Sequence, residues 1–413
     1  MRPAWFAALV AHTIALHGVY NASKVLMSYR TLDMGGGSVA VGLLTAVYSL
    51  APLLLAVPVG RRVDRGYAIP IMWAGTLLSV GGIVAAALAG ALPVLMGAAM
   101  AVGLGQLLMT VAGQALIPLS FEPADVTARF GTLTLGVSIG QTVGMPIAGF
   151  AAGTGGHPDA VRGMWVMAGL AALAIPAMLG VMARPAGPRI ARAEARAAAR
   201  SPLALLRIRG MKPAILASMA TLAAIDLMSA YLPVLGQAHG VGVQAVTLLL
   251  TVRTLATIVA RTAMGALMAR VRLTTLLWLS SAAAGICLLL FPVWVTVPVL
   301  AVLMVISGFA FGLTQPLTMG WVSHLADAAN RGAVMSIRLA GNRLSQVVLP
   351  SLASAMSAVF ATGSIFAMSG GLLLASSAAT WASARGAVGD GPAGEGGPAG
   401  EGGPAGESGE PRA

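Results

Sequence analysis

Six charged side chains interrupt otherwise apolar stretches of this 413-residue chain, and they are the residues best suited to chemistry. They are Lys24, Asp226, Arg253, Arg261, Arg338 and Arg343. If these stretches cross a bilayer, each charge is costly there and needs a partner, a water-filled cavity or a task. We predict that Asp226 pairs with Arg253 or Arg343, all three near mid-membrane. The surplus positive charge would then bind an anionic or zwitterionic small molecule. The alternative is a permanent structural ion pair.

The polar residues around these charges suggest a shared cavity. Asp226 is the only carboxylate in the apolar stretches, so it is the one obvious carrier if protons are involved. His17 and Asn21 lie four residues apart and therefore share a helix face. Gln106 and Gln141 could complete the cavity lining, although hydrogen bonds between helices explain all four of these polar residues too.

The other three cations are expected nearer the ends of their apolar stretches. Lys24 lies near the outer end of the first, and Arg261 and Arg338 lie near the opposite side. Long basic side chains at such positions commonly extend to the membrane interface. We therefore expect these three to be interfacial.

Sequence patterns for catalysis are missing. The chain has no GxxxxGK(S/T) phosphate loop, no HExxH or GxSxG pattern, and a single cysteine, Cys287, which cannot form a paired-thiol site. We expect no catalytic residues, no metal and no cofactor, and therefore no enzyme.

The elements that must position these side chains are membrane-spanning helices. Hydrophobic residues make up 57% of the sequence and charged residues 9%, well below the share in an ordinary soluble domain. The apolar runs are long enough to cross a bilayer. An all-α membrane protein with twelve transmembrane helices is expected, with spans near 5–27, 38–59, 68–89, 92–117, 131–153, 163–182, 213–236, 242–267, 273–295, 297–322, 333–358 and 363–384.

Basic residues between the spans predict the topology. The net charge of +12 comes largely from arginines in alternate short loops and in the segment 183–212. The positive-inside rule then places both termini and these loops in the cytoplasm. We expect a multi-pass protein of a bacterial cytoplasmic (inner) membrane that contacts membrane lipid and does not bind nucleic acid.

The sequence also divides into two halves. VGLLTAV at 41–47 matches VTLLLTV at 246–252, and the same offset of about half the membrane portion matches Gly60 to Gly265 and Arg65 to Arg270. We predict a six-helix bundle over 1–182, a basic central loop over 183–212, a second six-helix bundle over 213–386 and a disordered Gly/Pro/Glu tail over 387–413.

Two motifs resemble a known family. GRRVDR at 60–65, echoed by GALMAR at 265–270, is similar to the turn between spans two and three in the major facilitator superfamily. The resemblance implies two bundles around a cavity that opens alternately to each side. It also implies a conformational latch, formed by Gly60, Asp64, Arg65, Gly265 and Arg270.

The second motif bears on direction. GQTVGMPIAG at 140–149 is similar to a signature of proton-driven antiporters, with Met145 inserted before the proline. We therefore expect a secondary active transporter of a small organic solute, working by proton-coupled efflux. Uptake of an organic anion and flipping of lipid or lysolipid on the same fold are the alternatives.

Overall fold

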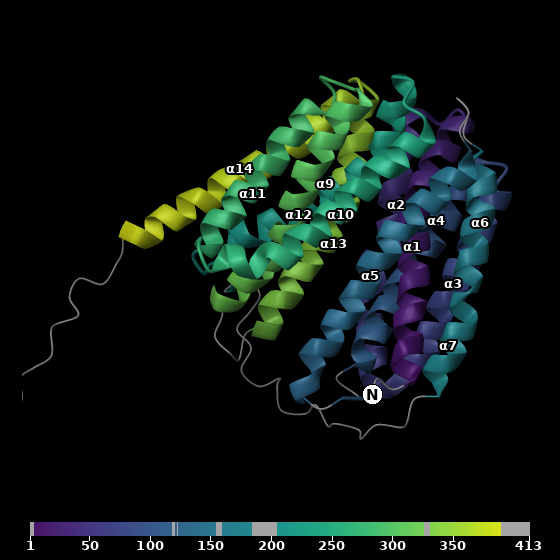
Figure 1. Ribbon diagram of the computed structural model, residues 1–413, viewed down its shortest axis with the longest axis horizontal. Coiled ribbons are helices and arrows are strands. Elements are labelled where there is room, and N and C mark those ends of the chain that lie inside the picture. Colours follow the sequence, from purple (N-terminus) through teal and green to yellow (C-terminus); the bar gives the residue numbers. More distant parts are fainter. Residues whose placement is uncertain are drawn as a thin grey trace, which may run out of the picture.

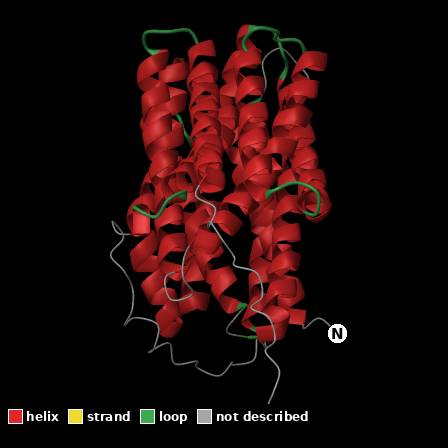
Figure 2. Cartoon of the chain, turned by 90° about the vertical axis from the view of Figure 1, so that its left-hand side faces the viewer, coloured by secondary structure: helices red, strands yellow, loops and turns green. Residues whose placement is uncertain are grey.

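Helices form all the regular secondary structure in the described part of the chain. The computed structural model describes residues 4–117, 120–121, 123–153, 159–183, 205–325 and 331–389, and Figure 2 shows only helices and loops there. Lipid offers no hydrogen-bond partner to a polypeptide backbone, so long apolar segments satisfy their own backbone groups as helices. The expected all-α class is confirmed.

The helices form two groups of six spans. In the first group, α6 and α7 together make one span with a break at Leu173. The elements of this group are α1 (Ala4–Asp33), α2 (Gly37–Arg62), the short turn η1 (Val63–Tyr67), α3 (Ala68–Leu88), α4 (Leu92–Leu116), α5 (Pro123–Ala152), α6 (Ala160–Ala172) and α7 (Ala174–Met182). The second group consists of α9 (Met211–Ala238), α10 (Val243–Met268), α11 (Leu273–Leu290), α12 (Val297–Leu325), α13 (Arg331–Ser357) and α14 (Gly363–Gly389).

Ten of these twelve described segments are long and apolar enough to cross a membrane by composition alone. The two that fall outside this set are α1 and α13, which carry Lys24 and Arg343 respectively. Helices that carry buried charge survive in a membrane when their polar faces point at protein or at a cavity. These two helices therefore belong at the centre of the molecule.

The predicted linker and tail fall mostly outside the described residues. Of the linker 183–212, residues 184–204 lie outside, and α9 already begins at Met211. Of the tail 387–413, residues 390–413 lie outside, and α14 continues to Gly389. Both segments remain predictions.

The two groups meet at one end of the molecule, which we call the closed end. Figure 1 shows them leaning together near the labels α2 and α9. There the Ser354 hydroxyl of α13 donates to the Val39 carbonyl of α2 at 2.8 Å, and the Tyr231 hydroxyl of α9 donates to the Ser38 carbonyl at 3.1 Å. Side-chain hydroxyls bonded to backbone carbonyls across the two groups therefore join them.

The opposite end carries the arginines of the α2–α3 and α10–α11 turns, and we call it the basic end. Figure 1 shows the lower ends of α5 and α13 well separated. A Cβ built on Gly60, Gly131 or Gly265 would meet no other atom within 4 Å, leaving aside each residue's own neighbours. Leu339 lies on the same α13 stripe as Ser354, at helical spacing, yet it is 53% exposed. The groups are therefore packed together at the closed end and apart at the basic end.

Candidate functional site

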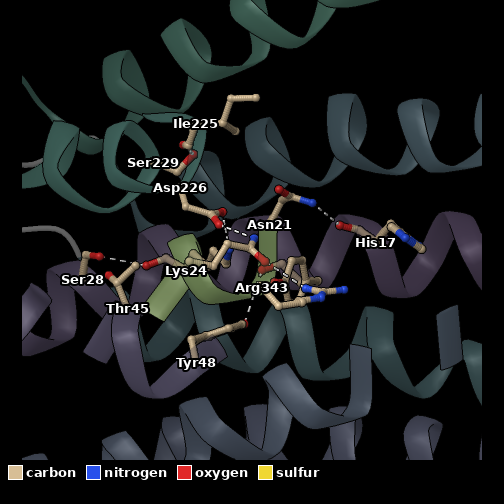
Figure 3. Close-up of polar contacts among 12 residues, drawn as sticks. His17, Asn21, Lys24, Ser28, Thr45, Tyr48, Ile225, Asp226, Ser229 and Arg343 are labelled. Carbon is tan, nitrogen blue, oxygen red and sulfur yellow. Dashed lines mark hydrogen bonds and ion pairs between the residues drawn. The ribbon is translucent and has the colours of Figure 1, made fainter. Parts of the chain in front are cut away.

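An ion pair joins the two groups of helices near the middle of the molecule. Lys24 Nζ on α1 lies 2.6 Å from Asp226 Oδ1 on α9, and the two side chains are 6% and 11% exposed (Figure 3). Breaking such a buried pair leaves an uncompensated charge, so each partner holds the other in place. Lys24 and Asp226 are 202 residues apart in sequence, so the contact is a product of the fold.

A glutamine extends this pair into a chain of four residues. Gln346 on α13 donates from Nε2 to Asp226 Oδ2 at 2.5 Å and accepts at Oε1 from Arg343 Nη1 at 3.0 Å. Since a carboxylate only accepts hydrogen bonds and a guanidinium only donates them, the chemistry of its neighbours fixes the orientation of the amide. We call Lys24, Asp226, Gln346 and Arg343 the central relay; it runs from α1 through α9 to α13.

Aromatic rings surround the lysine end of the central relay. The Lys24 ammonium lies 4.7 Å from the ring centroid of Tyr20 and 5.3 Å from that of Tyr48. The two rings contact each other edge to face, with centroids 5.3 Å apart. Ring faces attract cations in places where water is scarce. The site therefore holds the ammonium by one carboxylate and two rings.

The prediction that Asp226 pairs with Arg253 or Arg343 was wrong, and so was the expectation that Lys24 is interfacial. The carboxylate pairs with Lys24, while Arg343 reaches it only through Gln346. The reason is the length of α1, which continues to Asp33, beyond the expected end near residue 27. Lys24 therefore sits inside the helix and is buried, where we had expected an interfacial residue.

Arg253 adds a further buried cation to the centre. It lies on α10, is 6% exposed and interacts electrostatically with Asp226. Its Nε has no hydrogen-bond partner among the described residues. The described residues here thus include three cations, Lys24, Arg253 and Arg343, and one carboxylate, and only Lys24 pairs directly with it. This excess of cationic over anionic side chains suits an anionic ligand.

A second arginine–glutamine pair lies elsewhere in the second group. Arg338 Nη2 donates to Gln315 Oε1 at 2.5 Å, and Gln315 Nε2 donates to the Ser218 carbonyl at 3.1 Å. Arg338 is 6% exposed, so the expectation that it extends to the interface was wrong. Arg261, by contrast, is partly exposed on α10.

The remaining polar candidates bond mainly within their own helices. His17 Nδ1 donates to the Thr13 carbonyl at 3.0 Å, and Asn21 Nδ2 donates to the His17 carbonyl at 3.0 Å. Gln106 bonds one turn along α4, and Gln141 is half-buried on α5. The structure brings Asp226 and Arg343 together with Lys24 and Gln346; for the four polar candidates a place in a substrate cavity remains a prediction.

The predicted latch residues lie at the basic end. Gly66 has φ +97 in η1, a backbone conformation that only glycine adopts readily, and it turns the chain from α2 into α3. Residues Gly60, Arg65, Gly265 and Arg270 lie in or beside the α2–α3 and α10–α11 turns, and the side chain of Asp64 lies outside the described part. The latch remains a prediction.

Comparison with known proteins finds a family model that matches this chain. A family model described as "Major Facilitator Superfamily" matches residues 9–247 and 214–405. No curated protein matches the sequence significantly.

Solved structures match over nearly the whole chain. The nucleoside transporter NupG aligns with a TM-score of 0.75 at 14% identity, over 93% of this chain and 100% of that one. A D-xylose-proton symporter aligns at 0.73 and 14%, over 91% and 97%. An inward-facing, unoccupied bacterial homolog of the human lysosomal transporter Spinster aligns at 0.67 and 17%, over 93% and 96%. At these identities the likeness concerns the fold.

Proposed function

The chain belongs to the major facilitator superfamily, and from that premise we propose that it carries a small organic anion across the membrane together with a proton. Family membership makes it a multi-pass secondary transporter and not an enzyme. The observation that supports the finer proposal is the ion pair between Lys24 and Asp226, which joins the two groups of helices at their centre.

Proton coupling follows from what protonation does to this pair. A proton on Asp226 removes the negative charge that holds the Lys24 ammonium, while the lysine remains a cation. The two groups of helices then lose an electrostatic link between α1 and α9. That link joins one group to the other. Its loss therefore makes the present arrangement less stable relative to an arrangement in which α1 and α9 separate.

The same charges determine which solute would travel with the proton. Protonation leaves Lys24, Arg253 and Arg343 with no carboxylate among them, so the centre attracts an anion more strongly. By linkage, a bound anion favours protonation of Asp226 by the same free energy. Two ligands that favour each other's binding travel in the same direction, which supports symport and hence uptake.

The motif that favoured efflux has a structural explanation. Gly140 and Gly144 on α5 lie directly against Gly18 on α1, where added side chains would overlap backbone atoms. Small residues let helices approach closely in membranes. Packing therefore accounts for these glycines, and they give no support to either direction.

The orientation is part of the proposal. Under the positive-inside rule the basic end faces the cytoplasm, and both chain termini lie on that side of a bacterial inner membrane. The closed end would face outward, so the arrangement seen here would be open to the cytoplasm. A symporter in this arrangement releases its solute inward.

The experiment is a proton-flux measurement in proteoliposomes that contain a pH-sensitive dye. We would add matched pairs of solutes, each an organic acid with its neutral amide, to wild-type protein, Asp226→Asn and Asp159→Asn. Asp159 caps α6 at its exposed N-terminus, so it is a carboxylate away from the site. We expect an acid, and not its amide, to drive proton entry in wild type and Asp159→Asn, and not in Asp226→Asn. Solute uptake without proton movement in wild type, or unchanged coupling in Asp226→Asn, would refute the proposal.

A further inference from the structure

The side chain of Gln346 has two polar atoms, and each of them contacts a different charged group. Its Nε2 contacts the carboxylate of Asp226 and its Oε1 contacts the guanidinium of Arg343. An amide has one acceptor end and one donor end, so both contacts are satisfied in one orientation only. A change in what Asp226 offers can therefore reach Arg343 through this side chain.

We propose that Gln346 is a proton-controlled relay that frees Arg343 to bind the anionic group of the substrate. The inference rests on the proposed function for the identity of the ligand. It assigns a role to a neutral residue, and it concerns only how the hydrogen bonding of Arg343 depends on the protonation of Asp226.

The first step is the location of the proton. Asp226 Oδ1 accepts from Lys24, which donates in every protonation state, so an arriving proton is placed on Oδ2. The carboxylate becomes a carboxylic acid, and Oδ2 gains an O–H donor and becomes a weaker acceptor. It now faces Nε2 of Gln346, which is also a donor. The new O–H has no acceptor in this arrangement, and a neutral hydroxyl oxygen is a weaker acceptor for Nε2 than a carboxylate oxygen, so the amide turns over and presents Oε1 to Asp226.

The second step occurs at the other end of the same amide. After turning over, Gln346 presents its NH2 group to Arg343, and a guanidinium has no acceptor atom. The hydrogen bond to Nη1 is lost, and the guanidinium needs a new partner. Arg343 is only half-buried, and its α13 stripe also carries the exposed Leu339 toward the basic end. A carboxylate or phosphate group of the substrate, which bonds two guanidinium nitrogens at once, is that partner.

The chain contains its own control for this mechanism. Gln315 accepts from Arg338 as Gln346 does from Arg343, but its Nε2 donates to a backbone carbonyl, that of Ser218. A backbone carbonyl accepts at every pH. The hydrogen bond between Gln315 and Arg338 should therefore not change with the charge of Asp226.

Arginine-selective labelling tests the relay without knowledge of the substrate. Purified full-length protein in lipid nanodiscs is treated with phenylglyoxal at one fixed pH, and mass spectrometry measures adducts on Arg343 and Arg338. The variants are Asp226→Asn, Gln346→Met and the double variant. In Asp226→Asn, Lys24 draws the amide oxygen of Asn to itself, which leaves the Asn NH2 facing Gln346 and reproduces the protonated acid.

Asp226→Asn should raise the labelling rate of Arg343 by about tenfold, since a hydrogen bond to a charged group is lost. Arg338 should label as in wild type. Gln346→Met should raise Arg343 labelling too, and adding Asp226→Asn to it should have no further effect, because the connection is already cut.

Two outcomes would overturn the relay. One is unchanged labelling of Arg343 in Asp226→Asn, and the other is the same increase from Asp226→Asn whether or not Gln346 is present. A parallel rise at Arg338 would indicate general loosening and would likewise count against it. None of these labelling results measures proton flux. Proton-coupled transport through Asp226 is therefore tested separately, and failure of the relay would not refute it.

Discussion

At the scale of single residues, the Lys24–Asp226 pair should show strong mutual dependence. Lys24→Met leaves a buried carboxylate without its cation, which should lower stability by about 3–5 kcal/mol. The double variant Lys24→Met/Asp226→Asn removes both charges and should recover most of that loss. Thermal unfolding midpoints of the four proteins in one detergent measure this dependence.

Additivity is the result that would contradict the pairing. If the double variant loses as much stability as the two single variants together, the two residues do not interact. Lys24→Arg serves as the conservative control, because it keeps the charge and changes the shape of the donor.

The site was only partly predictable from residue types. Asp226 stands out as a lone carboxylate in an apolar run, and the excess of basic residues is equally plain in sequence. Its partner was missed because the apolar run ends before α1 does. Gln346 could not have been found, since a neutral amide gives no signal of charge and it meets Asp226 across 120 residues of sequence.

At the scale of elements, the contact between α1 and α5 should depend on glycines. A Cβ on Gly140 would overlap the Ile14 carbonyl of α1, whereas a Cβ on Gly131 of the same helix would meet nothing within 4 Å. We expect Gly140→Ala to lower the thermal midpoint. Gly131→Ala should leave it unchanged or raise it slightly, because alanine favours helix by about 0.5–1 kcal/mol over glycine. Equal effects of the two substitutions would show that close approach is not what Gly140 provides.

The sequence predicted the helices well and their ends less well. Hydrophobicity marks where lipid contact ends, and the backbone can remain helical past that point. Thus α5 begins at Pro123, eight residues before the expected span. The break between α6 and α7 also went unpredicted, although Pro176 explains it, because proline has no N–H to bond to the carbonyl of residue 172.

At the scale of the whole molecule, one glycine should control the balance between opening at the two ends. Gly42 on α2 packs at the closed end, where an added Cβ would overlap the Tyr231 hydroxyl and Ser354. Gly42→Leu should therefore destabilise closure at this end and favour an arrangement that is open there and closed at the basic end. Overpacking of about 1–3 kcal/mol shifts the ratio of two such states by roughly 5- to 150-fold.

A cysteine at Leu339 would report that shift. Leu339→Cys, in a background where the buried Cys287 is replaced by alanine, should react readily with a maleimide in the present arrangement and more slowly with Gly42→Leu added. Gly81→Leu is the control, because Gly81 lies within α3, outside the predicted latch, with no atom within 4 Å of its Cβ position. Slower reaction only with Gly42→Leu means that the ends are coupled through rigid groups of helices. Unchanged reaction would mean that the closed end opens locally, with no closure at the other end, and alternating access would then need another pivot than the α2–α13 contact.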